Sequence, residues 1–528
     1  MALTGKNLIG YQWGAEGSRT IQAVDPATLN RLEPVFTEAT EAECSRAVEL
    51  ARKASGDPRW RDPGVRSAFL REAASAIEAL GDTLIDRARA ETGLPAPRLQ
   101  GERGRTVNQL RLFADVVEEG SVVGARIDHG DPARKPVPKP DVRRMLIPIG
   151  PVAVFGASNF PLAFSVAGGD TASALAAGSP VVCKAHPAHP GTSELVAAAL
   201  VEAARKLELP EGVFSMLHGA SHEVGLLLTR HPDIQAVAFT GSQIAGRALF
   251  DAASSRPEPI PVYAEMGSVN PVFLLPGRLE ADPQGIARAL LQSFTLGVGQ
   301  FCTNPGLVIA PQGPALDRLL AELQSAVVEA SPGTMLHAGI RDAFDRGVRA
   351  FCSKAGVRVL GRSERGPDAG KTEAAPVALV TDAGTFLRDS DLAREVFGPS
   401  TLIIVCADRS EMLEVADSLE GNLTGTVQAT PADIEAHSDL IQALSAKVGR
   451  LVFNGFPTGV EVCHAMHHGG PYPATTSVRE TSVGTAAIFR FLRPLCYQDA
   501  PEAALPTELR DGNERGIWRL VDGEWTRH

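Results

Sequence analysis

The chain has 528 residues, of which 44% are hydrophobic, and a formal net charge of −11 at pH 7. This length exceeds one ordinary domain, so we expect two or three packed lobes with a substantial core. The negative charge argues against a nucleic-acid partner, and the apolar stretches end well before bilayer length, so no membrane span is expected.

The first elements along the chain are helices. Apolar residues recur at three- and four-residue spacing over 40–54 and 66–87, which predicts two amphipathic helices. Thr40 followed by Glu43 has the pattern of a capping box that opens the first of them. Residues 128–144 are rich in proline and charge, and they predict an exposed excursion between lobes.

From residue 146 the pattern becomes an alternation of strands and helices. Short β-rich runs occur at 152–156, 180–185, 212–217 and 236–241. Helix-length stretches lie at 161–177, 191–206, 221–230 and 243–254. This alternation predicts a parallel, doubly wound sheet, because each parallel crossover needs a covering helix. A second α/β pattern follows from about 270 to 455, with strands at 307–310, 401–407 and 449–455.

Two strand-to-helix turns are candidates for binding a nucleotide. Gly241 and Ser242 stand where a helix begins, so a pyrophosphate could bind free backbone N–H groups there; an ordinary capped helix is the alternative. Lys184 ends a strand, where it could contact ribose hydroxyls or a phosphate, or be a solvated surface charge. The usual GxGxxG fingerprint is absent.

The seven cysteines are scattered, with neither a CxxC pair nor the spacing of a zinc site. Such a set predicts reduced thiols and no bound metal. Because the first residues also lack a charged segment followed by an apolar core, no secretory signal is expected. Together these features predict a cytoplasmic protein.

Cys302 is the candidate nucleophile. Most cysteines are small buried hydrophobes, but this one lies in a polar loop between Gly299 and Gly306. Such a loop could direct backbone N–H groups at the thiol and at an oxygen developing negative charge. Glu265 follows a β-like run and precedes Gly267, so it is either a carboxylate at a strand end facing a cleft or a surface carboxylate.

Further polar residues follow strands or lie in turns. Asn159 could donate to an oxyanion, or it could cap a helix that has Pro161 in its first turn. Glu395 and Phe397 lie in a turn that could contact a ribose and form an aromatic wall. The histidines of 464–470 lack carboxylate or cysteine partners at supporting spacing, so we expect a loop with at most one functional histidine.

Taken together, these segments resemble the aldehyde dehydrogenase superfamily in order and spacing over nearly the whole chain. The matching segments are SNFP (158–161), PVVCK (180–184), FTGS (239–242), EMGS (265–268), GQFCTNPG (299–306), EVFGP (395–399) and FNGFPTG (453–459). The resemblance implies an α/β fold with a Rossmann-like nucleotide domain over 1–123 and 148–266 and an α/β catalytic domain over 267–465. It also implies a small β oligomerisation arm with a C-terminal segment, over 124–147 and 466–528.

The resemblance also implies roles. Cys302 is expected to attack the aldehyde, giving a thiohemiacetal and then a thioester. Glu265 is expected to be the general base for the deacylating water, and Asn159 with the backbone N–H of Cys302 to form the oxyanion hole. The implied cofactor contacts are Lys184 and Glu395 to the riboses, Phe397 beside the nicotinamide ring, and Gly241 and Ser242 near the pyrophosphate.

This chain departs from the common family pattern near the cofactor. Ser158 stands where the family usually has Trp, and EMGS replaces Glu-Leu-Gly-Gly. Pro187 stands where a Glu often favours NAD by binding the ribose 2′-hydroxyl. Loss of that carboxylate removes repulsion against a 2′-phosphate, yet proline donates nothing to it. The cofactor is therefore expected to be NADP or NAD, without a preference.

The same departures resemble one subgroup of the superfamily. It contains α-ketoglutaric semialdehyde (2,5-dioxovalerate) dehydrogenases and NADP-linked fatty-aldehyde dehydrogenases, and the RLVDGEW tail favours the first. A dianionic product implies a cationic or hydroxyl-rich pocket. Arg105 and Gln109, one helical turn apart, could supply it or could be helix-surface residues. Phe164 and His468 are further candidates for the substrate site.

The expected partner is a small aldehyde, with no nucleic acid and no membrane, and the resemblance implies a homodimer or homotetramer. A second hypothesis is a thiol acyltransferase or hydrolase that uses Cys302 without a nucleotide. It requires a Cys–His arrangement, with His467 or His468 as the base.

Overall fold

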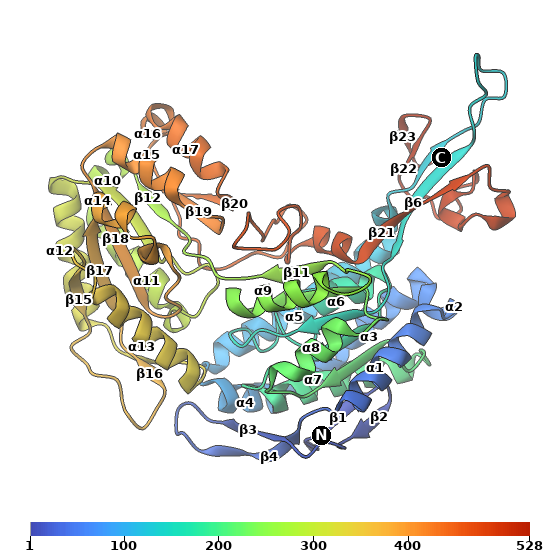
Figure 1. Cartoon of the computed structure of the whole chain (residues 1–528), viewed down its shortest axis with the longest axis horizontal. Helices are drawn as coiled ribbons and strands as arrows, with labels where there is room; N and C mark the ends of the chain where they lie inside the picture. Colours follow the sequence, from blue (N-terminus) through green and yellow to red (C-terminus); the bar gives the residue numbers. More distant parts are fainter. Residues whose placement is uncertain (1) are drawn as a thin grey trace.

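The first sheet has seven strands, and helices cover both of its faces (Figure 1). The computed structural model describes residues 2–528. The strand order is β11-β10-β7-β8-β9-β1-β2; neighbours from β11 to β9 are parallel, and β1 pairs antiparallel with β9 and β2. The strands are β1 (Asn7–Ile9), β2 (Gln12–Gly14), β7 (Val152–Phe155), β8 (Val181–Lys184), β9 (Phe214–Leu217), β10 (Ala236–Thr240) and β11 (Val262–Glu265).

Alternate side chains of this sheet enter two separate hydrophobic cores. Val152 and Val154 pack into one core, whereas Ala153 and Phe155 pack into the other. This period-two alternation fits a strand that is buried on both faces, and the predicted doubly wound sheet is confirmed. The first core is formed with α3 (Pro63–Ala79), α5 (Ala96–Glu119), α6 (Gly169–Ala177) and α7 (Pro190–Lys206), and the second with α1 (Glu41–Ser55), α8 (His222–Arg230) and α9 (Gln243–Ser254).

The second lobe contains another seven-stranded sheet, in the order β15-β17-β18-β13-β12-β19-β20. All of its neighbours are parallel except β15 and β17. Its strands are β12 (Val272–Leu274), β13 (Leu307–Pro311), β15 (Arg358–Arg362), β17 (Val377–Asp382), β18 (Ser400–Cys406), β19 (Asn422–Gln428) and β20 (Val448–Phe453). Helix α13 (Ala338–Cys352) packs into the core on one face, and α11 (Pro283–Thr295) with α12 (Pro314–Glu329) into the core on the other.

A third sheet forms an arm that extends away from both lobes (Figure 1). Its order is β21-β6-β5-β22-β23, with β5 (Arg126–Asp128), β6 (Val142–Pro148), β21 (Leu492–Gln498), β22 (Arg519–Val521) and β23 (Glu524–Thr526). Residues 130–138 are exposed, as predicted for this proline-rich stretch. The predicted position between the lobes is wrong, because the stretch is the projecting loop of the arm, and its last residues, 142–144, belong to β6.

The segment that precedes β21 returns to the first lobe. The backbone N–H of Met266 donates to the carbonyl of Ala474 at 2.8 Å. Ala487, Ile488 and Phe491 enter the core of the first sheet. This return path carries His468 to the end of β11. Within residues 2–528, no helix is both long enough and apolar enough to span a bilayer.

The helices and strands predicted from local patterns are found in the structure, with two exceptions. The Thr40–Glu43 capping box is confirmed, with Thr40 Oγ1 accepting from the Glu43 N–H. The single helix predicted over 66–87 is wrong, because α3 ends at Ala79 and α4 (Gly81–Thr92) begins at a glycine with φ of +55°. The helix predicted over 161–177 begins only at Gly169. Before it, the chain turns where the Glu102 carboxylate accepts from two backbone N–H groups.

Candidate active site

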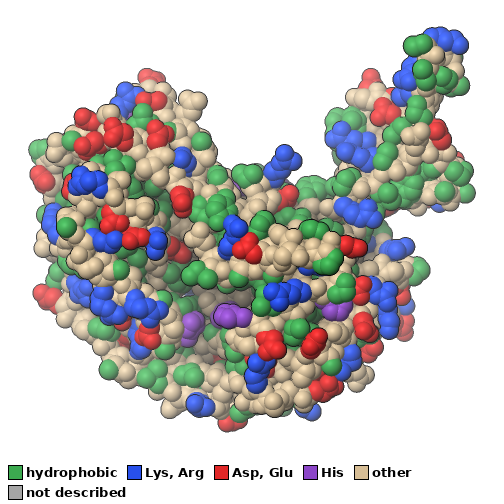
Figure 2. Space-filling model, in the orientation of Figure 1, with side chains coloured by type: hydrophobic (Ala, Val, Ile, Leu, Met, Phe, Trp, Pro, Cys, Tyr) green, Lys and Arg blue, Asp and Glu red, His purple; other side chains and the backbone are tan. Residues whose placement is uncertain are grey.

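A cleft of about 650 Å³ lies between the two lobes, within the range of cofactor sites. Its walls come from the ends of β7, β10 and β11, the start of α9, helix α13 and the loop 395–397. Figure 2 shows this face hollowed between the lobes, with histidine side chains in the hollow. Cys302, Glu265 and Asn159 all line the cleft, so the fold brings the three predicted catalytic side chains to one surface.

An unusual turn sets the position of Cys302. Gly297, Val298 and Gly299 follow α11 with φ of +57°, +59° and +66°. A Cβ at Gly299 would lie 2.2 Å from the backbone of Gly398. The positive φ and this close contact both require glycine at this position. The turn reverses the chain and directs it toward the cleft. The polar loop expected around the thiol is therefore built on a left-handed backbone.

Asn270 holds the loop that carries Cys302 through side-chain hydrogen bonds. Its buried Nδ2 donates to the carbonyl oxygens of Cys302 at 2.8 Å and Asn304 at 2.9 Å. Its Oδ1 accepts from the hydroxyls of Ser268 and Thr424, each at 2.9 Å. A network of buried, mutually satisfied groups of this kind specifies one geometry. Asn270 therefore positions the residue that carries the thiol.

His468 lies between the thiol and the carboxylate. Its Nε2 is 3.5 Å from Cys302 Sγ and 3.1 Å from Glu265 Oε1. The second carboxylate oxygen, Oε2, accepts from the Ser482 hydroxyl at 2.5 Å. Both His468 and Glu265 are buried, so these contacts form in a region of low dielectric. The structure thus places His468, predicted as a substrate contact, against both Cys302 and Glu265, the predicted nucleophile and base.

Burial and neighbouring groups shift the pKa values of Cys302 and Glu265. Burial raises the pKa of the Cys302 thiol well above its ordinary value, the Glu265 charge raises it further, and Arg105 acts in the opposite direction. Burial also acts to raise the pKa of Glu265, but its contacts with His468 and Ser482 prevail and lower it. In the resting site, the thiol therefore holds its proton and Glu265 is ionised.

Asn159 follows β7 and points its amide toward the cysteine loop. Its Nδ2 donates to the carbonyl of Gln300 at 3.0 Å, and its own carbonyl accepts from Arg98 at 3.0 Å. The side chain is half-buried and lines the cleft next to Cys302. An amide donor held in this way suits stabilisation of an oxyanion that forms beside the sulfur.

A buried cation lies near the thiol on helix α5. The Arg105 guanidinium stacks 5.1 Å from the ring centre of Phe164, and its Nε and Nη2 have no hydrogen-bond partner in the described chain. Phe164 in turn lies 6.4 Å from the ring of His468, centre to centre. Gln109, one turn beyond Arg105, is buried, with its amide against Gly169.

Arg450, within β20, is a second cation near the thiol: burial lowers the pKa of its guanidinium, and Cys302 acts in the opposite direction. Its Nη2 donates to the carbonyls of Pro457 and Gly459, and its buried Nε lacks a partner among residues 2–528. Two arginines from different lobes thus bring positive charge to the same region.

The start of α9 forms one wall of the cleft. Gly241 and Ser242 line it, and Ser242 caps the helix by accepting from the Ala245 N–H, so the predicted helix start is confirmed. Ser158 lines the cleft as well. The free N–H groups and positive dipole end of this helix suit a pyrophosphate, so the residues present fit a dinucleotide.

Lys184 and Pro187, two residues expected at the cofactor, do not line the cleft directly. Lys184 ends β8, and burial lowers the pKa of its ammonium to about 8. Pro187 follows at a half-buried position, and neither residue is among the described residues that line the cleft. In their place, His186 and His337 line it, with ring centres 6.4 Å apart.

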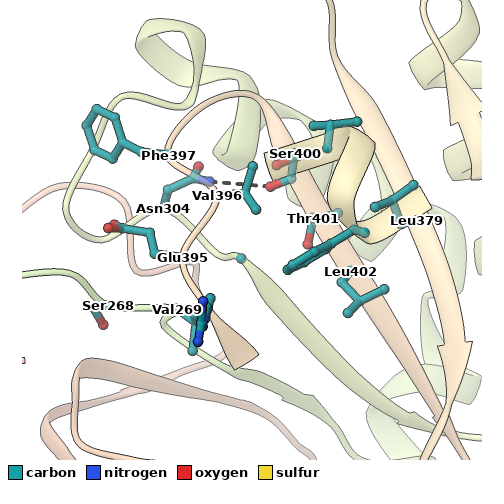
Figure 3. A pocket seen from close by; sticks show the side chains of 14 residues that line it. Ser268, Val269, Asn304, Leu379, Glu395, Val396, Phe397, Ser400, Thr401 and Leu402 are labelled. Carbon is teal, nitrogen blue, oxygen red and sulfur yellow. Dashed lines mark hydrogen bonds between the residues drawn. The ribbon is translucent and has the colours of Figure 1, made fainter. Parts of the chain in front are cut away.

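The loop after Arg394 completes the cleft. Glu395 and Phe397 line it, and Glu395 Oε2 lies so close to Gly267 that a Cβ there would be 2.7 Å away. Behind this loop is a small pocket (Figure 3). There the Asn304 amide reaches the carbonyl of Ser400 at 3.5 Å, which ties the cysteine loop to β18.

Sequence reasoning missed several residues that the structure brings to the site. His186 directly follows the candidate cofactor turn at Lys184, so its position in sequence was the available signal. Asn270, Ser482 and Arg450 gave no local signal. Asn270 is 32 positions from Cys302, Ser482 is 217 positions from Glu265, and Arg450 is 148 positions from Cys302. These positions are set by the packing of the two lobes.

Comparisons with known proteins agree with this arrangement. A sequence profile described as "Aldehyde dehydrogenase family" matches residues 13–484. "Alpha-ketoglutaric semialdehyde dehydrogenase 2" of Azospirillum brasilense is 51% identical over 527 residues, covering 99% of this chain and 100% of that protein. "Alpha-ketoglutaric semialdehyde dehydrogenase" of Acinetobacter baylyi is 44% identical over 525 residues, covering 99% of each.

Solved structures share the fold. An aldehyde dehydrogenase of Bacillus cereus in complex with NAD+ has a TM-score of 0.79 at 21% identity, covering 93% of this chain and 96% of that one. A 3,6-anhydro-L-galactose dehydrogenase in complex with NAP has a TM-score of 0.79 at 22% identity, covering 93% and 99%. The resemblance and fold predicted from the motifs are confirmed. The chain therefore belongs to the aldehyde dehydrogenase family, as a nicotinamide-dependent enzyme that oxidises aldehydes to carboxylic acids.

Proposed function

We propose that the chain oxidises α-ketoglutaric semialdehyde to 2-oxoglutarate, with NAD or NADP as the oxidant. The observation that carries the reaction is a thiol, Cys302, that lines a cleft of nucleotide size beside an ionised carboxylate, Glu265. The substrate assignment is supported by the two full-length relatives that bear this activity in their names.

In this proposal, Cys302 Sγ attacks the aldehyde carbon while the thiol proton passes toward Glu265, the ionised neighbour. The oxygen of the thiohemiacetal gains negative charge, which the Asn159 amide stabilises together with the backbone N–H of Cys302. A nicotinamide bound in the cleft supplies the hydride acceptor that the oxidation needs. The protein is then acylated on Cys302 as a thioester.

Glu265 also serves the second half of the reaction. Its lowered pKa keeps the carboxylate ionised at neutral pH, so it can remove a proton from the water that attacks the thioester. The Ser482 hydroxyl and His468 Nε2 orient this carboxylate. Attack of water releases the carboxylic acid and regenerates the thiol.

Arg105 is proposed to anchor the carboxylate of the semialdehyde. A buried guanidinium with two unpartnered N–H atoms in the described chain is costly unless a ligand supplies an acceptor. Phe164 holds the guanidinium from one side by cation–π stacking, and Gln109 lies further along the same helix face. Arg450 adds positive charge from the second lobe.

For the cofactor, we propose that Gly241 and Ser242 contact the pyrophosphate, that Lys184 and Glu395 contact the riboses, and that Phe397 lies beside the nicotinamide. Ser158 belongs to the same wall. Pro187 presents no carboxylate against a 2′-phosphate, and Lys184 supplies a cation, so both NAD and NADP are expected to serve. His186 and His337 offer imidazole faces at this wall of the cleft.

We infer that the arm assembles a homodimer or homotetramer, as aldehyde dehydrogenases are generally oligomeric. Strand β21 is an edge strand of the arm sheet, so its outer backbone groups are available to a partner. Trp518 and Trp525 of the arm are exposed. Light scattering after size exclusion measures the state, and a monomer at assay concentration would contradict this inference.

We propose a cytoplasmic location, because all seven cysteines are free, as they are in reducing compartments. Activity recovered mainly in a secreted or periplasmic fraction would contradict it.

The test of the function is a rate comparison across α-ketoglutaric semialdehyde, succinic semialdehyde and a long-chain aldehyde, each with NAD and with NADP. The expected result is the highest kcat/KM for α-ketoglutaric semialdehyde. A strong preference for the long-chain aldehyde would overturn the substrate assignment and favour a fatty-aldehyde dehydrogenase.

A further inference from the structure

Three potential metal ligands converge where the reacting groups lie. Cys302 Sγ, His468 Nε2 and one carboxylate oxygen of Glu265 all lie within 4.8 Å of one another. Sequence spacing predicts no metal site, because His468 is 166 positions from Cys302 and 203 positions from Glu265. Thiolate, imidazole and carboxylate are the ligand types that zinc prefers.

Two of the three separations match the edges of a tetrahedral zinc site. With Zn–S of about 2.3 Å and Zn–N and Zn–O of about 2.0–2.2 Å, a tetrahedron has S···N edges of about 3.5 Å and N···O edges of about 3.3 Å. The observed Sγ–Nε2 separation is 3.5 Å and the Nε2–Oε1 separation is 3.1 Å. These two edges thus match within a few tenths of an ångström, and the third separation, between Cys302 Sγ and the carboxylate oxygen, is within 4.8 Å.

The ion has a route in and an open coordination position. Cys302 and Glu265 line the cleft, whereas His468 lies behind them in the interior. An ion entering from the cleft meets the three ligands on one side and faces the cleft on the other. A water molecule from the cleft would complete the tetrahedron, so the site stays accessible to chelators.

We propose that Zn²⁺ binds Cys302, His468 and Glu265 and reversibly inactivates the enzyme. A Zn–S bond forms as the thiol S–H bond breaks, and the thiol proton leaves to solvent. The Nε2 proton of His468 moves to Nδ1 or to solvent, so that Nε2 donates its lone pair to the metal. No electron is transferred. The inhibition rests on the proposed roles of Cys302 and Glu265, whereas the binding rests on geometry alone.

Two neighbouring features set the affinity below that of a structural zinc site. His468 Nδ1 is buried without a hydrogen-bond partner in the part of the chain that the structure describes, and loss of such a partner costs about 10–100-fold in metal affinity. The Arg105 cation also faces the site. We therefore expect binding about 10–100-fold weaker than at a site whose ligating histidine has such a partner, as for a regulatory rather than a resident metal.

Cobalt provides a direct readout on the full-length protein. Added Co²⁺ is expected to give a thiolate-to-metal charge-transfer band in the near ultraviolet and intense visible bands of tetrahedral cobalt, which added Zn²⁺ abolishes. His468→Gln should weaken Co²⁺ binding at least about tenfold, because a lost ligand costs no less than a lost outer partner. His467→Gln, at the half-buried neighbouring position, is the matched control and should leave the spectrum unchanged.

Cys302→Ser is the second variant, and it should remove the charge-transfer band while the thermal unfolding midpoint shows that the protein remains folded. Aldehyde oxidation is measured in parallel, first with EDTA and then with buffered Zn²⁺. Inhibition reversed by EDTA supports the proposal. Full cobalt spectra in both His468→Gln and Cys302→Ser would overturn it, whereas absence of oxidation with EDTA would overturn the proposed function instead.

Discussion

Arg105→Met removes the proposed carboxylate anchor while keeping an apolar side chain against Phe164. Two guanidinium N–H groups, Nε and Nη2, lack partners in the described chain and are free to form charge-assisted hydrogen bonds with a substrate carboxylate. Each such bond contributes about 1.5–3 kcal/mol, so their loss is worth about 3–6 kcal/mol. At about 1.4 kcal/mol per factor of ten, kcat/KM should fall roughly 10²–10⁴-fold.

The assay measures kcat/KM for α-ketoglutaric semialdehyde and for pentanal, an uncharged aldehyde of the same chain length. The loss should be confined to the charged substrate. Arg111→Met is the control, because Arg111 lies on the same helix but pairs at the surface with Glu78 at 2.7 Å. Equal losses for both aldehydes in Arg105→Met would refute the anchor and indicate a structural role.

Three further predictions concern the cysteine loop. Because burial and Glu265 raise the pKa of Cys302, iodoacetamide alkylation of the cofactor-free enzyme should keep accelerating above pH 9, and a plateau near pH 7 would contradict this. Glu265→Gln removes a charge that raises that pKa, so alkylation at pH 8 should become faster while turnover falls about 100-fold or more; slower alkylation would contradict this effect of the Glu265 charge on the thiol pKa. Asn270→Ala leaves two carbonyls unpaired and should lower the free energy of unfolding by about 2–5 kcal/mol in urea titrations, against less than about 0.5 kcal/mol for the exposed Asp86→Ala.

Local signals were sufficient for most of the framework. The strands at 152–156 and 236–241 and the Thr40 cap depend on neighbours a few residues apart, so period and capping rules predict them. The helix predicted from 161 was wrong because a distant carboxylate, Glu102, binds the backbone N–H groups of Leu162 and Ala163 and holds a turn. A contact across 60 residues leaves no trace in the local pattern.

The site also contains residues that local motifs predict and residues whose positions depend on distant contacts. Cys302, Glu265 and Asn159 carry local motifs, and the ends of β7 and β11 bring the last two to the cleft. The contact of His468 with both reacting groups depends on the return of the C-terminal segment to the first lobe, which no periodicity predicts. Its local histidine-rich sequence indicated only that one histidine could be functional.

The most direct test of the central claim is to trap the acylated enzyme. Glu265→Gln is mixed with α-ketoglutaric semialdehyde and NAD or NADP, quenched in acid and digested, and the peptides are analysed by mass spectrometry. We expect one acyl group, as a thioester, on the peptide that contains Cys302, with one equivalent of reduced cofactor formed in a burst. A burst without an adduct on Cys302, or full turnover by Cys302→Ser, would contradict the account.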